Sequence, residues 1–120
     1  MKEDIKIRMF HLAVAVGKLC TKFPSSREYN AYCNQIIRSS SSVGANYRAA
    51  CRAKSDKDFI NKLKIVEEEA DETMYWLELL KEFSKSHEKE IDSLHKESNE
   101  LLSITVASIN TVRKRLNKNG

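Results

Sequence analysis

The chain has 120 residues, 41% of them hydrophobic and 32% charged, with a formal net charge of +4. That length and balance are typical of one soluble domain with a modest core, and they argue against a disordered chain. The longest apolar run, Phe10 to Val16, is too short to span a bilayer, and the first residues lack the pattern of a secretory signal. Three glycines, one proline and no strand-like alternation predict an all-α domain over residues 1–120, without a membrane partner.

The cysteines give no sign of a covalent or metal framework. Cys20, Cys33 and Cys51 are odd in number and none forms a close pair such as Cys-x-x-Cys. This pattern favours free thiols in a reducing cytoplasm over disulfides or a zinc site.

The first predicted helix covers residues 5–23, where apolar residues recur every three or four positions. Phe23-Pro24 ends it, and Ser25 with Glu28 three residues later is the pattern of a capping box for a second helix over residues 26–53. The centre of this second helix holds Ser39 to Ser42 and then Gly44. Small residues with middling helix propensity predict a close approach of neighbouring backbone there.

The third predicted helix covers residues 56–83, with Ser55 as its N-cap. It carries two apolar seams, and the second also contains Glu69, Glu72 and Trp76. A second seam indicates a subunit interface, although a wide core face produces the same pattern. A fourth helix over residues 89–116 completes an antiparallel up-down-up-down four-helix bundle.

Several short motifs in helices two and three resemble one bacterial family. They are Gln35 to Ser40, Val43 to Arg48, Ser55 with Asp58-Phe59, and Glu72 to Leu80. In order and spacing they resemble the 23S rRNA intervening-sequence proteins, over nearly the whole chain. The resemblance implies a four-helix bundle that assembles into a homopentameric ring. It also extends to the accessory variability proteins of diversity-generating retroelements, which bind nucleic acid and a reverse transcriptase but look more basic than this chain.

Four arginines of the second helix form a basic stripe, because they fall within an arc of about 80°. They are Arg27, Arg38, Arg48 and Arg52. The stripe has two interpretations: phosphate contacts with RNA, or ion pairs with the acids of helix three. A pair between Arg38 and Glu69 or Glu72 across a subunit boundary would set the register of a ring.

The remaining positive charge is concentrated near both ends of the chain, at Lys2, Lys6, Arg8, Arg113, Lys114, Arg115 and Lys118. In an up-down bundle the first and last helices are antiparallel, so we expect these residues to meet in one basic pole. Repeated around a ring, such a pole would attract RNA, whereas the plainer alternative is a solvated tail. No aromatic platform for stacking bases accompanies it.

No pattern in the chain indicates an enzyme. A single Asp92-x-x-His95 falls short of the two Glu-x-x-His motifs of di-iron bundles, and neither a nucleophile elbow nor a glycine-rich phosphate loop is present. We expect no cofactor and no metal. The sequence favours a homo-oligomeric scaffold that binds RNA or a nucleoprotein, with a protein-binding adaptor as the alternative.

Overall fold

The structure, a computed structural model, describes residues 2–119, with side chains for residues 5–118. All regular secondary structure in the described residues is helical. Its elements are α1 (Lys2–Cys20), α2 (Arg27–Cys51), α3 (Asp56–Phe83), the short 3-10 helix η1 (Lys85–His87) and α4 (Glu88–Asn119). They form an elongated bundle of 53 × 21 × 20 Å, as the all-α prediction required.

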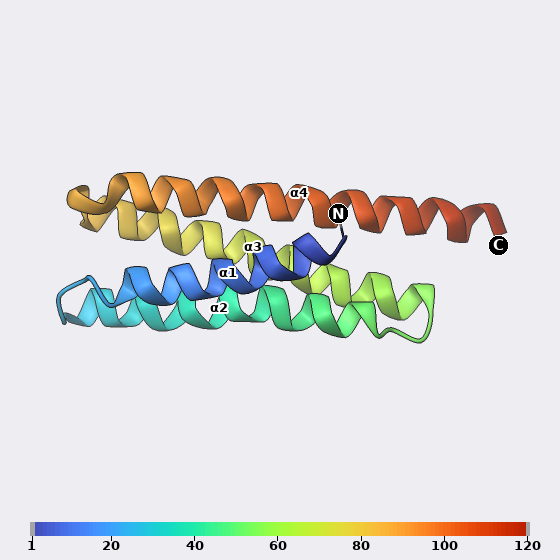
Figure 1. The fold of residues 1–120 in the computed structure, drawn as a ribbon, viewed down its shortest axis with the longest axis horizontal. Helices are drawn as coiled ribbons and strands as arrows, with labels where there is room; N and C mark the ends of the chain where they lie inside the picture. Colours follow the sequence, from blue (N-terminus) through green and yellow to red (C-terminus); the bar gives the residue numbers. More distant parts are fainter. Residues whose placement is uncertain (1, 120) are drawn as a thin grey trace.

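The chain turns back at each connection, so that helices adjacent in sequence lie side by side (Figure 1). α2 with α3 and α3 with α4 form the most extensive contacts, while α1 packs mainly on α2 and only lightly on α4. The first helix has 19 residues and the last has 32. α1 therefore covers only part of α4, and α4 extends beyond the start of α1 (Figure 1).

The core is built from the apolar seam of each helix. Its fully buried large side chains are Met9, Leu12, Val16, Leu19, Ile36, Val43, Leu63, Val66, Leu77, Leu80, Ile91 and Leu101. Hydroxyl residues also lie on these seams with almost no exposure: Ser39, Ser40, Thr73, Ser98 and Thr105. Of the buried side-chain polar atoms among the described residues, the Ser98 hydroxyl oxygen is the one without a hydrogen-bond partner.

The predicted cap of α3 is confirmed, and that of α2 is wrong by one residue. Ser55 accepts a hydrogen bond from the Asp58 N–H at 3.1 Å. For α2 the cap is Ser26, which has extended backbone and accepts from the Tyr29 N–H at 3.0 Å. A cap must be the last extended residue before the helix, and the position three beyond Ser26 is a tyrosine. The capping box with Glu28 therefore does not form.

Gly44 lies where α1 crosses α2. A Cβ at this position would lie 3.5 Å from the Met9 Cβ and 3.7 Å from the Met9 carbonyl oxygen. The predicted close approach of neighbouring backbone is confirmed, and α1 supplies that backbone.

Candidate functional site

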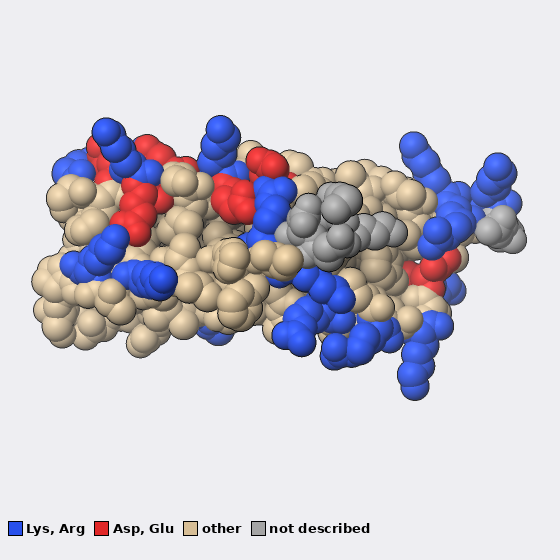
Figure 2. Space-filling model, in the orientation of Figure 1, with Lys and Arg blue, Asp and Glu red and all other residues tan. Residues whose placement is uncertain are grey.

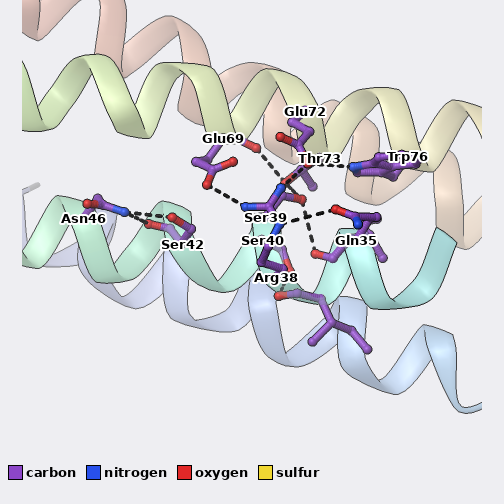
Figure 3. A network of polar contacts seen from close by, with 12 residues as sticks. Gln35, Arg38, Ser39, Ser40, Ser42, Asn46, Glu69, Glu72, Thr73 and Trp76 are labelled. Carbon is purple, nitrogen blue, oxygen red and sulfur yellow. Dashed lines mark hydrogen bonds and ion pairs between the residues drawn. The ribbon is translucent and has the colours of Figure 1, made fainter. Parts of the chain in front are cut away.

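A polar network joins α2 to α3 near the middle of the bundle (Figure 3). Arg38 donates to Glu69 at 2.9 Å and also contacts Glu72, and Trp76 Nε1 donates to Glu72 at 2.9 Å. Hydrogen bonds from the Trp76 ring and from Arg38 hold the pKa of Glu72 below its usual value. The structure thus brings together residues that the sequence marked as interface or ion-pair candidates. Their contacts lie within one chain, where they fix α2 against α3.

Two buried hydroxyls continue this network toward the core. Ser39 and Thr73 lie 2.9 Å apart, oxygen to oxygen, and Thr73 donates to the Glu69 carbonyl at 2.8 Å. Further along α2, the Asn46 amide donates to the Ser42 hydroxyl at 2.8 Å. The serine-rich segment therefore links the two helices at Ser39 and supports α2 locally at Ser42 (Figure 3).

Trp76 is accounted for by contacts within the chain. Its ring stacks on Tyr32 with 6.1 Å between centroids, and Tyr75 meets it edge-on at 5.2 Å. Among these rings Tyr75 is the exposed one, at 55%. The middle of the second seam of α3 thus packs against α2, while Ile65 and Phe83 near its two ends are 41% and 48% exposed.

An exposed apolar face lies instead on α1, where the sequence reasoning did not place one. Ile7, Phe10 and Val14 are 51%, 62% and 38% exposed. Their spacing of three and four residues puts them on one side of the helix, opposite the buried seam. Gly17 continues that side, and a Cβ there would meet nothing within 4 Å. The spacing of Ile7, Phe10 and Val14 is present in the sequence, but the second seam of α3 is longer and was predicted as the interface.

The predicted basic pole does not form from the two chain ends. Arg8 pairs with Glu97 at 2.6 Å and with Glu100 at 2.9 Å, so the start of α1 meets the middle of α4. From Glu100 to Arg113 the helix rises about 20 Å, which separates Lys6 and Arg8 from the end of α4. The expectation failed because α4 is much longer than α1. The side chain of Lys2 lies outside the described residues.

A different basic end does form, where the α2–α3 connection meets the C-terminal turns of α4. Arg115 fastens the two by pairing with Asp56 at 2.9 Å. Figure 2 shows Lys and Arg side chains gathered over this end, at the right of the view. We use "basic end" for seven exposed residues there: Arg48, Arg52, Lys54, Lys57, Arg113, Lys114 and Lys118. The sequence reasoning missed Lys54, which directly follows the predicted end of helix two, and Lys57, in the first turn of predicted helix three.

The hollows between the described helices are open, and most of the charged side chains that line them already have partners. A groove of about 410 Å³ between α1 and α4 is lined by Arg8 and by its partners Glu97 and Glu100, among others. Within the described part of the chain, no three His, Cys, Asp or Glu side chains gather closely enough to hold a metal ion. None of the helices described there is long and apolar enough to cross a membrane.

Comparison with known proteins agrees with the resemblance seen in the motifs. Residues 2–107 match the model of the 23S rRNA-intervening sequence protein family. The chain belongs to this family. A crystal structure of a protein with unknown function from the S23 ribosomal protein family of Bacteroides thetaiotaomicron is 35% identical, with a TM-score of 0.80. The similarity covers 88% of this chain and 97% of that one. No curated protein matches the chain.

The match to the 23S rRNA-intervening sequence family covers only part of the basic end. Arg48, Arg52, Lys54 and Lys57 fall inside the matched residues 2–107. The basic residues of the last α4 turns, from Arg113 onward, fall beyond them.

Proposed function

We propose that this protein is a non-enzymatic scaffold that binds RNA through its basic end. The observation that supports this is the uneven distribution of charge. Residues 48–62 and 101–118 contain nine basic residues and two acids, an excess of seven in a chain whose net charge is +4. The rest of the chain is therefore net negative. A concentrated positive surface attracts a polyanion far more strongly than the overall charge suggests.

We further propose that the scaffold is an antiparallel up-down-up-down bundle that assembles into a homopentamer in the cytoplasm. The reversal of the chain at each connection supports the topology (Figure 1). The exposed stripe of Ile7, Phe10 and Val14 on α1 supports association, because contiguous apolar residues on a surface helix favour burial against a partner. Free cysteines support a reducing compartment. The resemblance to the family supports the number five.

The alternative is an adaptor that binds another protein and does not contact nucleic acid. The same stripe on α1 favours it, since a heterologous helix would fit that face as well as a second copy. In that case the basic end would only improve solubility.

Light scattering after size exclusion, at low and high salt and with added structured RNA, tests the proposal. A salt-resistant pentamer whose mass rises with RNA only at low salt is the expected result. A pentamer that ignores RNA would favour the adaptor, and a monomer at all salt concentrations would reject assembly. Phe10→Ser should reduce the assembly. Tyr75→Ser is the matched control, because it removes a similarly exposed aromatic ring from α3 and not from α1.

A further inference from the structure

The basic end is shaped by three helix termini that are held together. The C-terminal turn of α2, the first turn of α3 and the last turns of α4 meet there (Figure 1). The ion pair between Arg115 and Asp56 ties α4 to α3, and the Ser55 cap holds the start of α3. The charges therefore project from a fixed frame and not from a loose tail.

The acids near this end are already neutralised. Asp56 pairs with Arg115, and Asp58 pairs with Lys62 at 2.7 Å. After Glu100 the sequence contains no acid at all. None of the seven residues of the basic end forms an ion pair with another residue of the described chain. All seven are exposed, so their charges face solvent and are free to contact a ligand.

The same surface offers no ring on which a base could stack. Tyr47 and Phe59, the aromatic residues nearest in sequence, are partly buried against the core. The exposed rings of Phe10, Tyr75 and Phe83 lie on other parts of α1 and α3. Proteins that hold single strands combine a basic groove with aromatic stacking, and this end has only the charge.

Along the outer face of α3 the charge changes sign. Lys57, Asn61 and Lys64 share one face of the helix, and the residues that continue it toward Phe83 are Glu68, Asp71, Tyr75, Glu78 and Glu82. A polyanion lying along α3 would meet this acidic stretch, so favourable contact is confined to the end of the bundle. That end is formed by the termini of α2, α3 and α4, and it lies within the 21 × 20 Å cross-section of the bundle.

We propose that the basic end binds double-stranded RNA through the phosphates of both strands, without reading the base sequence. A duplex carries roughly one negative charge per 1.7 Å of its axis, so 20 Å of duplex presents about twelve phosphates in two rows. Basic residues distributed over the termini of three helices can contact both rows, whereas a single strand presents only one. RNA duplexes are recognised mainly by such shape and phosphate contacts. This inference rests on the proposed RNA binding.

Fluorescence anisotropy tests the inference with two labelled RNAs. One is a duplex of about 20 base pairs, and the other is a single strand of that duplex, chosen so that it does not fold on itself. We expect the duplex to bind at least about tenfold more tightly, with similar affinity for unrelated duplex sequences. With four or five phosphate contacts, the logarithm of affinity should fall against the logarithm of salt with a slope of about −4. Equal or tighter binding of the single strand would overturn this inference and leave the proposed RNA binding standing. Binding to neither RNA at low salt would overturn both.

Paired variants locate the surface. Lys54→Gln with Lys57→Gln, and separately Lys114→Gln with Lys118→Gln, should each reduce the salt slope by about 2. The matched control is Lys85→Gln with Lys89→Gln, which removes the same charge at the opposite end of the bundle and should leave the slope unchanged. Circular dichroism checks that every variant keeps its helicity. An equal loss in the control would show that net charge and not the basic end governs binding, and the inference would fail.

Discussion

The buried hydroxyl pair between α2 and α3 predicts a thermodynamic coupling that can be measured. Thr73 gives its single proton to the Glu69 carbonyl at 2.8 Å, so Ser39 is the donor in the 2.9 Å contact between the two hydroxyls. Both side chains are fully buried. Removing the Thr73 hydroxyl leaves Ser39 poorly satisfied, whereas removing both leaves no stranded polar group.

We expect Thr73→Val to lower the free energy of unfolding by about 1.5 kcal/mol, because Ser39 can then reach only the Ile36 carbonyl at 3.3 Å. Ser39→Ala should cost about 0.5 kcal/mol, since the better helix propensity of alanine offsets part of the lost hydrogen bond. The double variant should cost about 1 kcal/mol, less than the sum of the two. The resulting coupling energy is about 1 kcal/mol.

Urea denaturation followed by far-UV circular dichroism measures all four proteins, and repeating it at two protein concentrations shows whether association contributes to the result. Ser41→Ala provides the control, because Ser41 is exposed on the same helix and should show no coupling to Thr73→Val. If the Ser39 and Thr73 substitutions add within about 0.3 kcal/mol, the hydroxyl contact does not contribute as reasoned.

Three further predictions concern α1 and α4. Ser98→Ala should raise the free energy of unfolding by about 1 kcal/mol in urea denaturation, because it removes a buried hydroxyl that has no hydrogen-bond partner. A lower free energy of unfolding would mean that this hydroxyl does form a hydrogen bond. Gly17→Ala and Gly44→Ala should each raise the free energy of unfolding by about 0.5–1 kcal/mol, measured in thermal melts, because alanine favours helix more than glycine does. Gly44→Leu should cost about 1–3 kcal/mol because its side chain would collide with Met9, whereas Gly17→Leu should be tolerated. Equal losses from both leucine variants would refute the crossing at Gly44. Arg8 lowers the pKa of Glu97, so this pair stabilises the fold above pH 4.5, the ordinary value, and the contribution is lost as pH falls through the lowered pKa. Wild type should therefore exceed Arg8→Gln in urea midpoint near neutral pH, and the two midpoints should converge as pH falls below the lowered pKa of Glu97; a constant difference would contradict the linkage.

Much of the fold follows from local signals in the sequence. The seam spacing places the helices, and Ser55 followed by acids marks the start of α3 correctly. The α2 cap was misplaced because Ser25 and Ser26 are both good cap residues, and only the backbone shows which is the last extended one. The close approach at Gly44 could be predicted because a glycine lowers helix stability, so its presence in a helix centre indicates that a neighbouring helix lies close.

The candidate site was harder, because it depends on how far each helix extends along its neighbours. Sequence periodicity gives the faces of a helix but not its axial offset. The pole predicted from Arg8 and Arg113 assumed that α1 and α4 end at the same level. Arg8 instead meets Glu97, and the basic partner of the α4 terminus is the α2–α3 connection. The sequence suggested an ion pair between Arg38 and Glu69, but no pattern in it indicated whether the two residues belong to the same chain or to different chains.

Because α1 packs less extensively than the other long helices, it should detach from the bundle more easily than they do. α3 packs extensively against both α2 and α4, whereas α1 rests mainly on α2 and is tied to α4 through Arg8. Detachment of α1 would leave three helices still packed, so it is the natural unit of partial unfolding. Its amide hydrogens should exchange with solvent before those of the other helices. A partner on the outer side of α1 would slow that exchange, which makes the first helix a reporter of assembly.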